Sequence, residues 1–233
     1  QRMEFPLTPL FNNRILEVTE NTPLQSEIAL TLYAGGEPMT VRRSFPVTLY
    51  ERHAMRWDRK AKLGAFVTHK DPAIADFSRL VVQQYVDAYP NLPQAVVYAR
   101  GIYGALGVLG LKYIIDPTSP FTEFSGSATA VDYLQYPRDT LARKSGDCDD
   151  LSVLFAACME NIGIGAAFVD APGHVFVMFN TGVLEKDKVT LGFPDELLVP
   201  YQGTVWIPVE MTMVGTSFTR AWRKGAEEYR TWA

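Results

Sequence analysis

The 233-residue sequence predicts an α+β fold with a helix packed on an antiparallel sheet, preceded by a β-rich N-terminal segment. β-forming residues alternate or cluster over roughly the first 60 residues, and helical spacing replaces them further on. An apolar helical pattern over residues 149–162 is followed by three apolar strands. The order helix, strand, strand, strand indicates an antiparallel sheet that carries the helix. We therefore expect two parts, residues 1–65 and residues 66–233.

The first part is predicted to be β-rich, as a partial β-sandwich or a β-layer that leads into the second part. Alternating patterns predict strands at RILEVTE, SEIALTLYA and MTVRRSFPVTLYE. The residues Ala34-Gly35-Gly36-Glu37 supply a turn between the last two strands. Too few strands are visible to close a complete sandwich.

Two helices are predicted early in the second part. Asp71 is a suitable N-cap and Pro72 a suitable first helical residue, and apolar residues then recur at helical spacing until Pro90. A second helix is expected from about residue 94 to residue 109. Residues 116–130 have the composition of a loop.

The C-terminal half carries the pattern of the predicted core. The helix over 149–162 should end at Gly163, which is a typical C′ residue. Two strands follow this helix, GAAFVD and HVFVMFN, and then a charged insertion over residues 183–203, expected as a loop or hairpin. The third strand, TVWIPVEMT, and a final amphipathic helix, SFTRAWRKGAEEYRTW, come after the insertion.

Composition excludes several functional classes. A net charge of −4 without a basic stripe indicates no nucleic-acid partner. No apolar run has the length of a membrane span, so we expect no span in this chain. Two cysteines and three dispersed histidines give no metal-ligand spacing, and we expect neither a metal nor a cofactor. The chain opens at Gln1 without a basic-then-apolar leader, which indicates a processed or trimmed chain. We also expect it to be part of a larger protein.

One cysteine and one histidine form the candidate reactive pair. Cys148 lies at the expected helix start, where N–H groups and the helix dipole stabilise a thiolate. His174 begins an apolar strand and is the side chain best suited to accept the thiol proton near neutral pH. Asp147, Asp149 and Asp150 oppose activation because nearby negative charge raises the pKa of a thiol, so Cys148 should need His174 as imidazolium.

The two neighbouring aspartates Asp147 and Asp150 have expected structural roles. Asp147 is expected to cap the helix, and Asp150 to anchor the preceding loop. Cys158 lies in the middle of the same helix on its apolar face and is expected to be structural. Because the two cysteines would lie roughly 15 Å apart along one helix, no disulfide is expected. His53 and His69 have no cysteine or carboxylate pattern around them and are expected to be surface or packing residues.

The segments GDCDDLSVLFAACMENIGI, PGHVFVMF and WIPVEMT, in this order, resemble the transglutaminase-like superfamily of cysteine enzymes, over roughly residues 130–215. The resemblance implies a transglutaminase-like (papain-like) core. Its nucleophilic cysteine begins a helix that packs on an antiparallel sheet, and its histidine and acid lie on adjacent strands. The chain is similar to bacterial members of this superfamily that are envelope or secreted proteins. This similarity favours a periplasmic or extracellular location.

The resemblance implies the catalytic residues Cys148, His174 and Glu210. Glu210-Met211-Thr212 is similar to the family's acid-x-threonine, although the family usually has aspartate there. The 36-residue gap after His174 is long, and the insertion 183–203 accounts for it; Asp195 is the alternative acid. The backbone N–H of Cys148 can donate to an oxyanion, with Tyr133, Gln135 or Tyr136 as open choices for a second donor.

The expected function is thiol-dependent acyl transfer on a peptide or protein substrate, as a cysteine peptidase or amidase that cleaves peptide or glutamine-type amides. Transfer to a lysine amine would make it a protein-crosslinking transglutaminase. The resemblance to bacterial members favours hydrolysis. A non-catalytic interaction module that keeps the fold is the alternative from another class.

Overall fold

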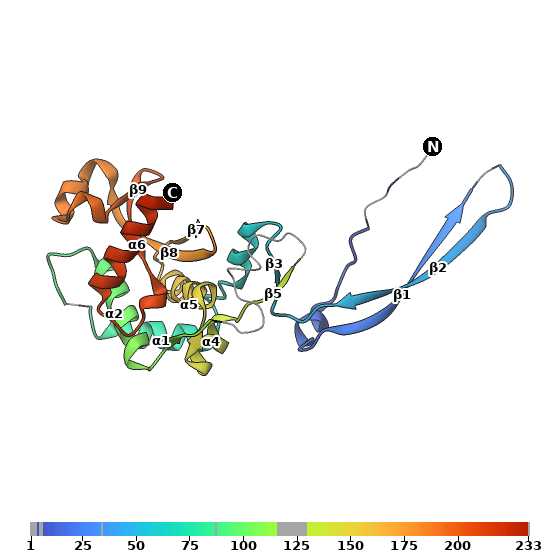
Figure 1. The fold of residues 1–233 in the computed structure, drawn as a ribbon, viewed down its shortest axis with the longest axis horizontal. Helices are drawn as coiled ribbons and strands as arrows, with labels where there is room; N and C mark the ends of the chain where they lie inside the picture. Colours follow the sequence, from blue (N-terminus) through green and yellow to red (C-terminus); the bar gives the residue numbers. More distant parts are fainter. Residues whose placement is uncertain (1–3, 5–6, 34, 87, 116–129, 233) are drawn as a thin grey trace. The chain divides into compact units, whose positions relative to one another are not determined.

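The computed structural model of the chain describes residue 4 and residues 7–33, 35–86, 88–115 and 130–232 (Figure 1). Contacts divide the chain into two compact units, Gln1–Ala54 and Met55–Ala233. The predicted loop 116–130 lies outside the described residues except for its last residue, and the predicted turn at Ala34 lies partly outside them.

The first unit contains an antiparallel hairpin of β1 (Thr22–Leu32) and β2 (Met39–Leu49). These strands confirm two of the three strands predicted for this segment. Leu24 lies opposite Val47 and Leu30 opposite Val41, which places a row of apolar side chains on one face of the hairpin. Most of the residues in both strands are exposed.

The third predicted strand of this segment, RILEVTE, is wrong. Residues Asn13–Glu17 form a short 3-10 helix, η1. The side chain of Asn12 accepts a hydrogen bond from the backbone N–H of Arg14 at 3.0 Å. This local side-chain bond fixes a turn at the start of the segment, and such a bond competes with strand pairing whatever the alternation of the residues that follow.

The second unit is built around an antiparallel sheet with the strand order β7-β8-β10-β9. Its main strands are β7 (Ala166–Ala171), β8 (His174–Leu184) and β10 (Thr204–Val209), and β9 (Val199–Tyr201) pairs with β10 at the edge. The predicted α+β fold with an antiparallel sheet is thus confirmed at this level.

Helices surround this sheet and carry the predicted signals at their ends. Asp71 caps α1 through a bond from the Ala73 N–H, and Gly163 follows the last turn of α5 with a φ of 79°. The described α-helices are α1 (Pro72–Gln83), α2 (Gln94–Val108), α4 (Pro137–Arg143), α5 (Cys148–Asn161) and α6 (Phe218–Trp232). Among the described residues, no helix combines the length and the apolar character that crossing a bilayer requires.

Short elements complete the second unit. Two minor sheets join β3 (Ala54–Arg56) to β5 (Val131–Tyr133) and, in parallel, β4 (Lys112–Tyr113) to β6 (Ser145–Gly146). The 3-10 helices of this unit are η2 (Lys60–Phe66), η3 (Glu185–Leu191), η4 (Asp195–Leu197) and η5 (Met211–Met213). The predicted insertion 183–203 therefore consists of the end of β8, two 3-10 helices and β9.

The central helix α5 is buried and packs against β8. From Cys148 to Met159 every residue of α5 is buried, so this helix has no solvent-facing side over that length. Val177 and Phe179 of β8 belong to the same core as α5, whereas Phe176 and Met178 point into a smaller apolar cluster with Trp206. The alternation along β8 shows that both faces of the sheet are covered.

The C-terminal helix α6 approaches β10 closely at Gly225. A Cβ atom at this position would lie 2.9 Å from the Pro208 carbonyl carbon and 2.9 Å from the Val209 nitrogen. Ala221, also on α6, accepts a hydrogen bond from the Glu210 N–H through its carbonyl oxygen at 3.1 Å. The glycine therefore allows α6 to lie directly on the strand that leads to Glu210.

We expect Gly225→Ala to destabilise the protein by about 1–3 kcal/mol, because backbone atoms would have to move to admit the methyl group. Urea unfolding measures the effect. Gly104→Ala is the matched control: Gly104 is an exposed helical glycine with open space around its Cα, and alanine there should stabilise the protein by up to about 1 kcal/mol. Equal stabilities for the two variants would contradict the close packing of α6.

Candidate functional site

The start of α5 is held in place by a short parallel strand pair. Lys112 and Tyr113 of β4 pair with Ser145 and Gly146 of β6, and the chain enters α5 two residues later. Cys148 is the first residue of α5, as predicted, and Asp147 takes the N-cap position. The capping role expected for Asp147 is wrong, because its side chain makes no cap hydrogen bond.

Cys148 is nearly enclosed, with 4% of its surface exposed. Burial raises the pKa of its thiol well above the ordinary value, and the charges of Asp149 and Asp147 raise it further. A hydrogen bond with the backbone of Val175 acts in the opposite direction. The resting side chain is therefore a thiol, and it needs a base to become a nucleophile.

Val175 is the residue directly after His174, and α5 holds it at two points. Besides its backbone bond with the Cys148 thiol, its carbonyl oxygen accepts a hydrogen bond from the Ser152 hydroxyl at 3.4 Å. Ser152 lies one helical turn after Cys148. The start of β8, and with it His174, is thus fixed against the first turns of α5.

Three buried aspartates surround the start of α5. The Asp147 and Asp149 side chains are hydrogen-bonded to each other, which requires one of the two carboxyl groups to carry a proton. Burial and this bond raise the pKa of Asp149 well above its ordinary value. The cluster therefore bears less negative charge beside Cys148 than the three carboxyl groups would bear in water.

Asp150 anchors the preceding loop, as expected from the sequence. It accepts hydrogen bonds from the backbone N–H and the side-chain amide of Gln135, at 2.7 and 2.5 Å. Burial and the charge of Asp147 raise the pKa of Asp150 to about 7, while the Gln135 bonds lower it. A Cβ on Gly146 would lie 2.5 Å from the Asp150 Cβ, so only glycine fits beside this anchor.

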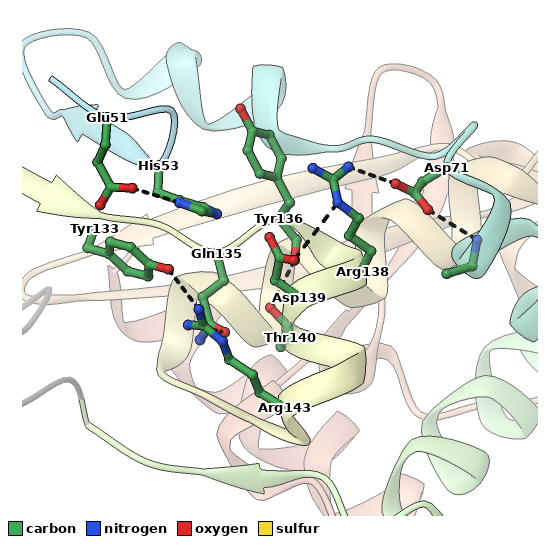
Figure 2. A network of polar contacts seen from close by, with 11 residues as sticks. Glu51, His53, Asp71, Tyr133, Gln135, Tyr136, Arg138, Asp139, Thr140 and Arg143 are labelled. Atoms are coloured by element: carbon green, nitrogen blue, oxygen red, sulfur yellow. Dashed lines mark hydrogen bonds and ion pairs between the residues drawn. The ribbon is translucent and has the colours of Figure 1, made fainter. Parts of the chain in front are cut away.

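The three side chains considered as second oxyanion donors are engaged in other contacts. Figure 2 shows Arg143 reaching both the Tyr133 hydroxyl (3.1 Å) and the Gln135 side-chain oxygen (3.2 Å). Tyr136 stacks on Phe66 with ring centroids 5.2 Å apart. These residues support the loop that leads to α4 and α5, and their contacts point to a structural role.

His174 and Glu210 are brought together, as expected from the resemblance of the sequence. The Nε2 atom of His174 lies 2.7 Å from Oε2 of Glu210, whose side chain is only 3% exposed. Glu210 follows β10 directly, and β10 is the neighbour of β8 in the sheet. Burial lowers the pKa of His174, but the bond and charge of Glu210 outweigh it, so the pKa lies above its ordinary value.

Glu210 is held as an anion by several donors. Its second oxygen, Oε1, accepts from the Thr212 N–H at 2.9 Å and the Thr212 hydroxyl at 2.6 Å. Burial raises the pKa of Glu210, but the His174 and other hydrogen bonds lower it to about 2. Asp195, the alternative acid, lies in η4 and pairs with Lys188 at 3.1 Å, with 78% of its side chain exposed. The carboxylate on His174 is therefore that of Glu210.

Two side chains near these residues did not emerge from the sequence. Glu228 on α6 places Oε2 3.7 Å from His174 Nε2 and is hydrogen-bonded to Glu210. Tyr113 on β4 is 40% exposed; burial raises the pKa of its hydroxyl, and a negative charge on Cys148 would raise it further. Only the pairing of β4 with β6 could have indicated that Tyr113 lies near the site. Strands of two residues are too short to be predicted from an alternating sequence pattern.

A small, mainly apolar cavity is lined in part by Val175, the residue whose backbone bonds to Cys148. It has a volume of about 280 Å³, and its lining includes Trp57, Leu63, Phe168 and Val175. Trp57, Leu63 and Val175 also share an apolar cluster with Cys148. An ion pair between Lys60 and Asp170, two further lining residues, borders the cavity.

The remaining cysteine and histidines are placed elsewhere. Cys158 is fully buried in the core and, like Cys148, is a free thiol, so the absence of a disulfide is confirmed. Burial raises the pKa of Cys158 to about 12. His53 is buried and pairs with Glu51 at 3.0 Å, and the carbonyl oxygen of His69 accepts from Asn161 at 2.7 Å. Both histidines have packing roles in these contacts.

Two groups of potential metal ligands occur among the described residues. One comprises His174, Glu210 and Glu228; the other comprises Asp147, Asp149 and Asp150. In each group the ligand atoms lie within 4.8 Å of one another, but hydrogen bonds within the group already join them. We therefore identify neither group as metal ligands.

Comparisons with known proteins give no assignment for this arrangement. Protein-family models, curated proteins and solved structures were compared with the chain, and none of them matches it.

Proposed function

We propose that the chain is a transglutaminase-like cysteine hydrolase that cleaves peptide or glutamine-type amides through an acyl-enzyme. Its second unit would then be the catalytic domain, with a papain-like core. The observation that carries the proposal is the linkage at the site: the thiol of Cys148 bonds to the backbone of Val175, and the preceding residue, His174, is bonded through Nε2 to Glu210. Thiol, imidazole and carboxylate are the three groups that such chemistry requires.

In the first step Cys148 Sγ would attack the carbonyl carbon of the amide. Because Glu210 accepts from Nε2 of His174, Nδ1 is the ring nitrogen that would take the thiol proton. The charge of Glu210 then stabilises the imidazolium. The new S–C bond converts the carbonyl into a tetrahedral oxyanion, which the backbone N–H of Cys148 can stabilise.

In the second step the C–N bond breaks, and the imidazolium of His174 would protonate the departing amine. An acyl-thioester on Cys148 remains. If water attacks it, with His174 accepting the water proton, a carboxylic acid and free thiol result; if a lysine amine attacks, the product is a crosslink. We favour water because of the resemblance to bacterial members, which also favours a periplasmic or extracellular location.

The cavity lined by Val175 is the proposed site for an apolar side chain of the peptide or protein substrate. Trp57, Leu63 and Val175 line it and lie in the same cluster as the thiol. A side chain held there would keep the adjoining carbonyl near Sγ, which lowers the entropic cost of the attack. Substrate binding would also displace water from the site, which strengthens the interaction between His174 and Glu210.

A non-catalytic interaction module is the second candidate, and one observation favours it. Cys148 is 4% exposed and its pKa is raised, as for a structural cysteine. The reactivity of the thiol in the folded protein separates the two candidates.

We expect iodoacetamide to modify Cys148 faster than Cys158 in the folded protein, with a rate that depends on pH through His174. His174→Gln should slow the modification of Cys148 about 100-fold, at the lower end of what a general base supplies. Mass spectrometry of the digested chain measures both sites. His69→Gln is the control, because His69 makes its bond to Asn161 through the backbone and the rate should not change. Equally slow modification of both cysteines would favour the non-catalytic module.

We expect Glu210→Gln to slow Cys148 modification at least about tenfold near neutral pH, because it removes the charge that stabilises the imidazolium of His174. Glu210→Asp should recover part of the rate, since the shorter side chain reaches Nε2 less well. Asp195→Asn is the control, and it should leave the rate unchanged because Asp195 pairs with Lys188 on the surface. A slow Asp195→Asn variant together with a fast Glu210→Gln variant would reverse the assignment of the acid.

Tyr113, whose hydroxyl interacts electrostatically with Cys148, is the second oxyanion donor that we propose. We therefore expect Tyr113→Phe to lower kcat by about 100-fold for a peptide anilide with glutamine at the cleaved bond, the usual loss for one oxyanion donor. The raised pKa keeps the Tyr113 hydroxyl protonated and able to donate. Alkylation of Cys148 by iodoacetamide forms no oxyanion and should keep its rate. Tyr133→Phe, which loses the bond from Arg143 to the hydroxyl, is the control. An unchanged kcat in Tyr113→Phe would remove this residue from the mechanism.

A further inference from the structure

Glu228 is a second carboxyl group that reaches the histidine of the candidate site from a different element. It lies on α6, ten residues after the start of that helix, whereas His174 and Glu210 come from β8 and the end of β10. Its side chain is 18% exposed, and Oε2 lies 3.7 Å from His174 Nε2.

The contact between Glu228 and Glu210 requires a proton. Their side chains are hydrogen-bonded to each other. Two carboxylates have only acceptors, so this bond exists only when one of the two groups is protonated. Oε2 of Glu228 is buried and accepts no hydrogen bond from an N–H or O–H group of the described residues, and one oxygen of each carboxyl group lies within 4.8 Å of the other.

The surroundings decide which of the two carries the proton. Glu210 accepts from His174 and twice from Thr212, so it is the anion. Burial and the neighbouring charge of Glu210 raise the pKa of Glu228 to about 7, while His174 and Lys224 lower it. Lys224 Nζ lies 3.3 Å from Glu228 Oε1, and 43% of the lysine side chain is exposed. Solvent therefore screens the effect of Lys224 on the pKa of Glu228.

We propose that Glu228 is a positioning residue: its carboxyl group donates the shared proton to Glu210 and so holds that carboxylate on Nε2 of His174. The effect of this role on catalysis depends on the proposed thiol mechanism. The backbone bond from the Glu210 N–H to Ala221 ties α6 to the same point, so helix and carboxylate are aligned together. Because Glu228 ionises near neutral pH, the arrangement also makes the charge around His174 dependent on pH.

Ionisation of Glu228 has two opposed effects on the site. It removes the hydrogen bond that holds Glu210, and it adds a second negative charge near the imidazole, which raises the pKa of His174. The charged and titratable groups that face Glu228 among the described residues are His174 on β8, Glu210 after β10, and Lys224 on its own helix. The two glutamates and the histidine therefore titrate as one coupled group.

NMR titration of histidine in the full chain tests the proposal without a substrate. The chain has three histidines, and His174→Gln identifies the signal of His174. We expect Glu228→Gln, which keeps a donor to Glu210 but removes the charge, to lower the pKa of His174 by about one unit. Glu227→Gln is the matched control: Glu227 lies 3.7 Å from Lys224 on the same helix and is 66% exposed, and its removal should leave His174 unchanged.

Thermal unfolding against pH gives a second reading. The pKa of Glu228 is raised in the folded state, so the stability it contributes is present below its unfolded pKa of about 4.5 and is lost as pH rises through about 7. Glu228→Gln should match the wild type near pH 5 and exceed it at pH 8, whereas Glu227→Gln should follow the wild type throughout.

The outcomes separate this proposal from the proposed function. An unchanged His174 titration together with an unchanged stability curve in Glu228→Gln overturns the positioning role. If Glu228→Gln is too unstable to titrate, Glu228→Asp replaces it: a partial shift supports the role and no shift overturns it. If His174 responds to Glu228 while Cys148 proves as unreactive as Cys158, the carboxyl pair stands and the thiol mechanism fails.

Discussion

The hydrogen bond between His174 Nε2 and Glu210 Oε2, at 2.7 Å, is the interaction on which the site depends. It joins the start of β8 to the residue directly after β10, the neighbouring strand. The start of β8 also contacts the start of α5. A buried carboxylate without donors would be strongly destabilising, so the imidazole and Thr212 are needed to keep Glu210 charged. In return, the charge of Glu210 keeps a protonated imidazole favourable despite its burial.

Negative charge is the main physical problem of this site, and shared protons reduce it. Five carboxyl groups lie around Cys148 and His174: Asp147, Asp149, Asp150, Glu210 and Glu228. Within two pairs, Asp147–Asp149 and Glu210–Glu228, a carboxyl hydrogen bond requires one protonated member. The thiol is therefore less opposed by its neighbours than the GDCDD sequence suggests, although burial still holds its pKa above the ordinary value.

The sequence predicted the elements that depend on local signals and long patterns. The apolar run after Cys148, the cap at Asp71 and the strand that begins at His174 are of this kind. It failed at RILEVTE, where the side-chain bond of Asn12 overrides the alternation. Among the site residues, the meeting of His174 with Glu210 was expected from the resemblance and could not have been deduced from a 36-residue separation.

Glu228 and Tyr113 were missed for a different reason, since their importance arises only from tertiary placement. Glu228 lies in an amphipathic helix whose charged residues all look solvated in the sequence, and only the packing of α6 at Gly225 brings one of them to His174. Asp147 shows the reverse case: its position at the helix start was predicted, but its side chain bonds to Asp149 instead of capping the helix.

The most direct measurement of the central claim is the intact mass of the chain after brief mixing with an activated peptide ester and acid quenching. An acyl-enzyme mechanism predicts that the chain gains a single acyl group, which digestion maps to Cys148 as a thioester. This thioester should disappear on longer incubation, because water attacks it. Absence of the adduct, or the same adduct on a Cys148→Ala variant, would contradict an acyl-enzyme at this cysteine.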